Sequence, residues 1–187
     1  MAQTRVHCGA FYEEATCNLF QADRHVIDST ADICPDLSLG KGQYLEVKSV
    51  GLSRQSLIYS NRLAHDRDLV NYTKGTLHYV FWIHNVEAAK CHSLHVLRDE
   101  LARNVEEILV VPFDQLEQAC QSIPAQIMNY RAARSDGRAA QPMPGRRLSY
   151  RLLKELAGNT ERARALSAPV YSILPLPQRM RQFAHNA

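Results

Sequence analysis

The 187-residue chain has no long apolar run, and no segment approaches the roughly 20 apolar residues that a membrane-spanning helix needs. Residues 1–7 lack the apolar stretch of a secretory signal peptide, so we expect a cytoplasmic protein that does not contact a membrane. The five cysteines include no Cys-x-x-Cys pair, which favours reduced, mostly buried thiols. No Gly-x-x-x-x-Gly-Lys-Ser/Thr loop occurs, so nothing in the sequence suggests hydrolysis of ATP.

One small group of metal-ligating residue types is present, at Cys91, His92 and His95. A structural zinc site needs four ligands, and the second half of such a site is missing from the sequence. We therefore favour ordinary thiols and imidazoles over a zinc site at these positions.

Charge is divided unevenly along a chain whose composition, 45% hydrophobic and 22% charged, is that of a globular protein. Residues 1–130 contain 11 Lys+Arg against 16 Asp+Glu, a net charge of −5, whereas residues 131–187 contain 11 against 3, a net charge of +8. Arginine presents a planar donor fork that suits phosphate, so the basic segment is a candidate DNA-binding surface, with a solvated basic tail as the alternative. The expected contacts are Arg131, Arg134, Arg138, Arg146, Arg147 and Arg151.

Apolar periodicity predicts an α/β domain with a mixed sheet and helices on its faces, built from residues 1–130. We expect helices at residues 9–20, 53–72 and 114–122, the last beginning on Asp114 as its cap, and strands at 25–39, 44–48, 77–83 and 108–112, with a turn at 40–42. Residues 131–187 are predicted to form a basic C-terminal extension: a loop or linker at 132–147, a short helix at 148–156 and a Pro-punctuated tail.

The residues that suggest chemistry lie around the expected hairpin. Side chains two apart in a strand share a face, so Glu46 and Lys48 emerge together while Leu45 and Val47 enter the core. If the preceding strand pairs with this one, Asp36 lies beside Glu46, and two adjacent carboxylates repel unless a cation separates them. Carboxylate oxygens suit Mg²⁺, for which Mn²⁺ should substitute, and Mg²⁺ takes its remaining ligands from water and phosphate.

Further groups are candidates for the same site. Glu13, on the first helix, is expected to reach the metal directly or through water, with Glu14 as the alternative. Asp32 is the alternative to Asp36 as a ligand. Lys48 is expected to orient the attacking water or help to deprotonate it, because burial beside a metal lowers a lysine pKa.

The sequence Pro35-Asp36, nine intervening residues and then Glu46-Val47-Lys48 resembles the PD-(D/E)xK nuclease superfamily, which includes restriction endonucleases, Holliday-junction resolvases and replication-repair nucleases. The resemblance covers residues 9–83 and includes the helical Glu13, four residues after Gly9. Gln55 and Tyr59 resemble the Gln-x-x-x-Tyr element of the RecB-like branch, in which these side chains support the site. The resemblance to this superfamily implies a restriction-endonuclease-like fold and an Mg²⁺-dependent nuclease acting on DNA.

We therefore expect hydrolysis of phosphodiester bonds by metal-activated water, at a site made of Glu13, Asp36, Glu46, Lys48, Gln55 and Tyr59. The alternatives are a DNA-binding module that no longer cuts and a subunit of a larger assembly; a homodimer is also open. The sequence does not distinguish endonuclease from exonuclease, or DNA from RNA, and it does not name the pathway.

Overall fold

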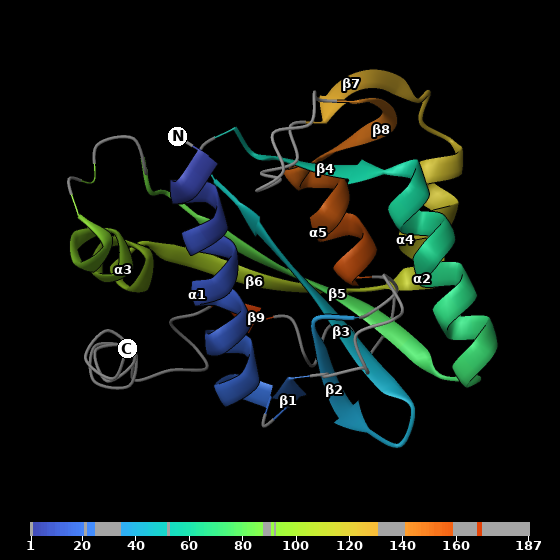
Figure 1. Ribbon diagram of the computed structural model, residues 1–187, viewed down its shortest axis with the longest axis horizontal. Coiled ribbons are helices and arrows are strands. Elements are labelled where there is room, and N and C mark those ends of the chain that lie inside the picture. The colour runs from blue at the N-terminus through green and yellow to red at the C-terminus, as the bar shows by residue number, and fades with distance from the viewer. Residues whose placement is uncertain are drawn as a thin grey trace.

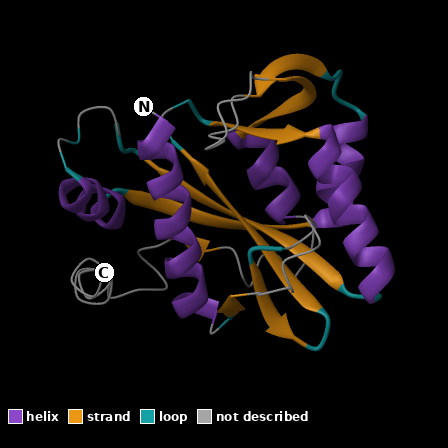
Figure 2. Ribbon diagram, in the orientation of Figure 1, coloured by secondary structure: helices purple, strands orange, loops and turns teal. Residues whose placement is uncertain are grey.

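The computed structural model describes residues 2–20, 22–24, 35–51, 53–87, 91, 93–130, 141–158 and 168–169. These residues form a mixed α/β fold with two sheets (Figures 1 and 2). The helices are α1 (Ala2–Phe20), α2 (Ser60–Thr73), α3 (Leu94–Arg103), α4 (Phe113–Gln121) and α5 (Tyr150–Gly158). The strands are β1 (Asp23–Arg24), β2 (Leu37–Gly40), β3 (Gln43–Val50), β4 (Gln55–Tyr59), β5 (Thr76–His84), β6 (Val105–Pro112), β7 (Gln126–Tyr130), β8 (Gln141–Ser149) and β9 (Ala168–Pro169).

The larger sheet has the strand order β1-β2-β3-β5-β6-β9. Strands β3 and β5 are parallel and the other neighbours are antiparallel, so the mixed sheet expected from the sequence is confirmed. Every residue of β5 after Thr76 is buried, in agreement with a central strand covered on both faces. The hairpin of β2 and β3 turns through Gly40, Lys41 and Gly42, all with positive φ, at the position predicted for the turn.

Two apolar clusters lie on opposite faces of this sheet, as the alternation along β5 and β6 requires. Helices α1 and α3 pack on one face, against side chains such as Val47, Val80 and Trp82. Helices α2, α4 and α5 pack on the other face, against Tyr79, Phe81 and their neighbours. Figure 1 shows this second group of helices gathered beside the smaller sheet. None of the described helices is both long enough and apolar enough to span a membrane.

The smaller sheet, of order β4-β8-β7, corrects the prediction of one helix over residues 53–72. Its first part is strand β4, in which buried Ser56 and Ile58 alternate with more exposed neighbours, a period of two. Helix α2 begins only at Ser60 and continues past His65 without a break. Leu57 and Ile58 fitted a helical stripe by spacing, but pairing with β8 decides their conformation.

Strand β8 also replaces part of the predicted linker at residues 132–147, because Gln141–Ser149 pairs with both β4 and β7. Helix α5 follows it, close to the short helix predicted at 148–156, and places Leu153 and Leu156 in the second apolar cluster. Both elements therefore pack with segments from the first 130 residues. Residues 131–140 and, apart from β9, residues 159–187 lie outside the described part of the chain.

Other local predictions need correction. Helix α3 was not predicted; its N-cap is Ser93, whose side chain accepts from Val96 N at 3.2 Å. Asp114 lies in the first turn of α4 rather than at its cap, which is Pro112 and makes no side-chain capping bond. Of the strand predicted at 25–39, the described part is β2, after Pro35, and residues 25–34 lie outside the described chain.

Candidate functional site

Strand β3 lies between β2 and β5 and presents Glu46 and Lys48 on the face covered by α2. Its neighbours Leu45 and Val47 enter the apolar cluster on the α1 face, as strand alternation requires. In the parallel pair Glu46 lies opposite Tyr79, and the Lys48 ammonium lies 6.0 Å from the centre of the Tyr79 ring. The two charged side chains of β3 therefore stand over a buried aromatic surface rather than in open solvent.

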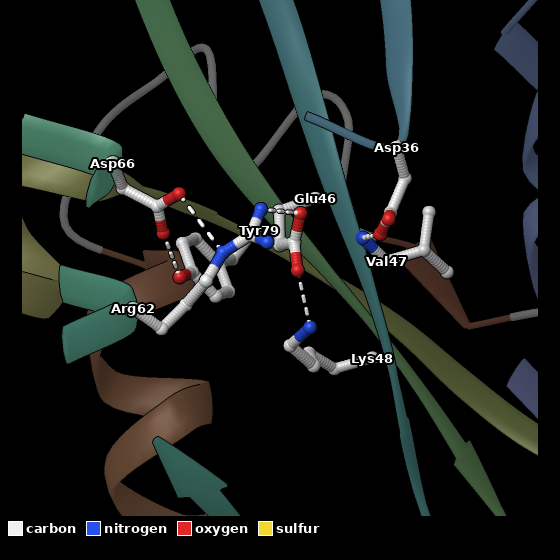
Figure 3. Close-up of polar contacts among 7 residues, drawn as sticks. All are labelled: Asp36, Glu46, Val47, Lys48, Arg62, Asp66 and Tyr79. Atoms are coloured by element: carbon white, nitrogen blue, oxygen red, sulfur yellow. Dashed lines mark hydrogen bonds and ion pairs between the residues drawn. The ribbon is translucent and has the colours of Figure 1, made fainter. Parts of the chain in front are cut away.

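Asp36 immediately precedes β2, and the register that pairs Leu37 with Leu45 brings it to the level of Glu46. Its Oδ2 accepts a hydrogen bond from Val47 N at 2.7 Å, so the carboxyl is attached to the β3 backbone (Figure 3). Burial and repulsion from Glu46 raise the pKa of Asp36 to about 7, against the opposing effects of Lys48 and the Val47 bond. The Asp36 and Glu46 carboxyl groups therefore repel each other in the fold, in addition to the larger effect of burial on Asp36.

Glu46 is 1% exposed, and each of its carboxylate oxygens is bound by a cation. Lys48 Nζ donates to Oε1 and Arg62 Nη2 donates to Oε2. Figure 3 shows Lys48 and Arg62 reaching Glu46 from one side of β3 while Asp36 approaches β3 from the other side, where β2 lies. Removing either cation would leave a buried carboxylate oxygen without its partner.

The ion-pair network continues beyond Arg62 into the core. Arg62 Nε lies 3.0 Å from Asp66 Oδ1, and the Tyr79 hydroxyl donates to Asp66 Oδ2. Cations and carboxylates therefore alternate along the order Lys48, Glu46, Arg62, Asp66, and the series ends on Tyr79. We name these five residues the β3–α2 charge network.

Burial and mutual attraction fix the charges within this network. Burial alone would lower the pKa of Arg62, but Glu46 and Asp66 raise it above its ordinary value, so the guanidinium stays positive. Burial raises the pKa of Asp66, opposed by Arg62 and by the Tyr79 hydrogen bond. Burial and then Asp66 raise the pKa of Tyr79, which therefore remains a hydroxyl donor.

Arg62, Asp66 and Tyr79 were not identified as site residues from the sequence, although Asp66 is 1% exposed. The spacing of Arg62 and Asp66, four residues apart, is a recognisable helical ion pair. The pattern was hidden because Leu57 and Ile58, which lie on strand β4, were counted in the apolar face of the helix predicted from residue 53. Leu63 and Leu69, which flank Asp66 on the buried side of α2, are the signal that would have identified that face.

Glu13 and Glu14 on α1 have different surroundings. Glu14 Oε2 pairs with Arg98 of α3 at 2.9 Å, so it is directed away from β3. Glu13 is half-buried and acts electrostatically on Asp36, although as the weakest of the named influences on that carboxyl. Because α1 covers the face opposite Glu46, Glu13 can assist Asp36 but does not join the β3–α2 charge network.

Gln55 and Tyr59 lie on strand β4, so the predicted helical pair is wrong. Four residues along a strand place two side chains on one face but about 13 Å apart. Tyr59 packs over Gly145 of β8, where an added Cβ would lie 3.3 Å from Tyr59 Cδ1. Tyr59 therefore has a packing role in the smaller sheet, and Gln55 is exposed at the far end of β4.

Only part of the predicted arginine surface lies within the described chain. Arg131, Arg134 and Arg138 lie outside it, as do Asp32 and His92 of the alternative metal sites. Arg146 has a structural role, since its Nε donates to Ile123 O at 3.0 Å and its Nη1 donates to Ser60 Oγ at 2.7 Å. Arg147 on β8 and Arg151 on α5 are exposed.

A divalent cation at this site would have the Asp36 and Glu46 carboxylates as its protein ligands. Within the described ranges, no group of three or more His, Cys, Asp or Glu side chains is arranged to hold a metal. Two carboxylates nevertheless suit Mg²⁺, which commonly keeps several waters and takes phosphate oxygens as its other ligands. Glu46 would have to release one of its two cationic partners to become such a ligand.

Comparisons with known proteins identify no relative of this chain. No protein-family model, curated protein or solved structure matches the chain.

Proposed function

We propose that the chain is a metal-dependent phosphodiesterase that acts on nucleic acid, with Asp36, Glu46 and Lys48 as the core of its active site. The observation that carries the proposal is the coupling of Asp36 to a buried Glu46, with Lys48 bound to that glutamate. Two carboxyls that repel each other within a fold favour a cation between them. A lysine at the same place suits a reaction in which negative charge develops on phosphate.

The order of the elements supports a restriction-endonuclease-like fold. Helix α1 with Glu13 comes first, Asp36 leads into β2, β3 contains Glu46 and Lys48, and α2 connects to the buried strand β5. This is the order that a resemblance to the PD-(D/E)xK superfamily implies. The strand β4, inserted before α2, departs from it, because the expected Gln-x-x-x-Tyr helix is absent at Gln55 and Tyr59.

The proposed residue roles follow from these positions. A bound Mg²⁺ or Mn²⁺ would activate water and neutralise charge on the phosphate. Asp36 and Glu46 would hold the ion, and Lys48 would orient the attacking water or the phosphate beside Glu46. The attacking water would lose a proton as it forms the new P–O bond, the bond to the leaving sugar oxygen would break, and the leaving oxygen would take up a proton. Glu13 supports Asp36 from α1.

Nucleic acid is the proposed substrate because arginines are concentrated beyond residue 130. Of these, Arg147 and Arg151 are exposed on β8 and α5, elements that pack with the main fold. The assay described below distinguishes hydrolysis of duplex, single-stranded and branched DNA.

A second candidate function is binding of nucleic acid without cleavage. It is favoured by one specific observation, that both carboxylate oxygens of Glu46 are already neutralised by Lys48 and Arg62. A site that no longer binds a metal would have the same arrangement. The two functions differ in whether a divalent ion can displace one of those partners.

The test compares wild type with Lys48→Ala and Glu46→Gln on linear, circular, single-stranded and branched DNA, with Mg²⁺, Mn²⁺ or EDTA. Lys41→Asn is the matched control, because it removes an exposed lysine from the nearby turn and asparagine tolerates the positive φ there. We expect cleavage by wild type and the control, and none by the two site variants or in EDTA. Undiminished cleavage by Lys48→Ala in clean preparations would refute the mechanism, and salt-sensitive binding without any cleavage would favour the second function.

A further inference from the structure

The geometry of the β3–α2 charge network points to a role for Arg62 that goes beyond structural pairing. We propose that Arg62 is a phosphate-binding residue, which exchanges Glu46 for a phosphate oxygen of the nucleic acid when a divalent cation binds Glu46. This inference rests on the proposed nuclease function and assigns a residue to its substrate site.

Glu46 has no room for a further partner as it stands. Its carboxylate is 1% exposed, and Lys48 and Arg62 each bind one of its oxygens. Because almost none of the carboxylate is exposed, we expect a metal ion from solvent to reach it only when one of these contacts opens. The metal and at least one of the two cations therefore compete for the same carboxylate.

Arg62 is the partner that is built to move to a new acceptor without leaving the site. Its Nε lies 3.0 Å from Asp66 Oδ1, and Asp66 is itself fixed by the Tyr79 hydroxyl. If Nη2 releases Glu46, this second contact still holds the guanidinium beside the carboxylate. The Arg62 side chain is 28% exposed, so a phosphate arriving from solvent can reach it. Guanidinium also binds phosphate through parallel hydrogen bonds, which an ammonium does not provide.

Charge balance gives the exchange a direction. Lys48 and Arg62 carry two positive charges, and Glu46 and Asp66 carry two negative charges, so these four groups are balanced. A divalent ion placed on Glu46 leaves Arg62 close to a second positive centre, which is unfavourable at short range. A phosphodiester between the ion and Arg62 supplies the missing negative charge. Arg62 should therefore oppose metal binding without nucleic acid and favour it when nucleic acid is present.

The experiment measures Mn²⁺ binding and cleavage separately on the full chain. Arg62→Gln removes the charge but keeps an amide that can bond Asp66, whereas Arg62→Lys keeps the charge but removes the planar fork. Arg67→Gln is the matched control, since Arg67 lies on the same helix and pairs with Glu117 at the surface. Calorimetric titration with Mn²⁺ is performed with and without a duplex oligonucleotide bearing a non-hydrolysable linkage, and kcat and KM are measured on the hydrolysable duplex.

We expect Arg62→Gln to bind Mn²⁺ about tenfold more tightly than wild type without DNA, while its kcat/KM falls at least tenfold. DNA should enhance Mn²⁺ binding in wild type and much less in Arg62→Gln. Arg62→Lys should keep the metal affinity of wild type but lose cleavage, and this variant provides the same test if Arg62→Gln does not fold. The control should resemble wild type throughout.

The outcomes separate this inference from the function on which it rests. Wild-type cleavage together with unchanged kcat/KM in both Arg62 variants overturns the role of Arg62 and leaves the nuclease proposal intact. Weaker Mn²⁺ binding by Arg62→Gln without DNA also overturns it, because a merely structural arginine would support Glu46 rather than compete with the metal. No Mn²⁺ binding by wild type, with or without DNA, overturns both proposals.

Discussion

Replacing Asp36 with asparagine should stabilise the metal-free protein at alkaline pH. Burial and the neighbouring Glu46 raise the pKa of Asp36 to about 7, so the ionised carboxylate is unfavourable in the fold. Asparagine keeps an acceptor for the 2.7 Å hydrogen bond from Val47 N but removes the charge. The substitution therefore removes the repulsion and retains the backbone contact.

The size of the stabilisation follows from the difference between the Asp36 pKa of about 7 and its ordinary value of 3.8. This difference corresponds to about 4 kcal/mol, and because the carboxyl is only half-buried we expect about 2 to 4 kcal/mol. The folded state binds the proton more tightly than the unfolded chain, so the contribution to stability is fully present below pH 3.8 and is lost as pH rises through 7. Between pH 5 and pH 8 the free energy of unfolding of wild type should fall by about 2 to 3 kcal/mol more than that of Asp36→Asn.

The assay is equilibrium urea unfolding in EDTA at pH 5 and pH 8, for wild type, Asp36→Asn and the exposed control Asp68→Asn. The difference in free energy of unfolding between variant and wild type at each pH cancels the contributions of other titrating groups. One such group is His84, whose pKa burial lowers to about 4. If Asp36→Asn is no more stable than wild type at pH 8, the two carboxyls do not repel each other in the fold. That result would also remove the main reason to expect a cation between them.

Two further predictions concern the structure that holds the site. Asp66→Ala should lower the free energy of unfolding by about 3 to 5 kcal/mol, because it removes both the partner of Arg62 Nε and the acceptor of the buried Tyr79 hydroxyl and leaves Arg62 with Glu46 alone. Tyr79→Phe should lower it by only about 1 to 3 kcal/mol, because Arg62 still pairs with Asp66. Equal losses in urea unfolding would contradict the network. Gly75→Ala should lower the free energy of unfolding by about 1 to 3 kcal/mol or more, because a Cβ there would lie 2.2 Å from Gly42 O. That oxygen accepts the hydrogen bond from Thr76 N that joins the start of β5 to the β2–β3 turn. An unchanged thermal midpoint would refute this packing.

Parts of the fold and site followed from the sequence because local rules decide them. The apolar run of β5 can only be buried, and two glycines around Lys41 specify a tight turn, so the central strand and the hairpin were predicted correctly. The same alternation rule placed Glu46 and Lys48 on one face of β3. The register that brings Asp36 level with Glu46 needed only the assumption that the hairpin strands pair.

Contacts between segments far apart in the sequence decided the rest of the fold and of the site. Strand β4 has helix-compatible spacing, and β8 contains two prolines, so neither reads as a strand until each lies beside the other. Arg62, Asp66 and Tyr79 come from α2 and β5, and nothing in their spacing relates them to Glu46. The sequence by itself determined which residues on β3 are charged and share a face. Only the tertiary structure decided that Glu46 is buried between two cations, because that depends on packing α2 against the sheet.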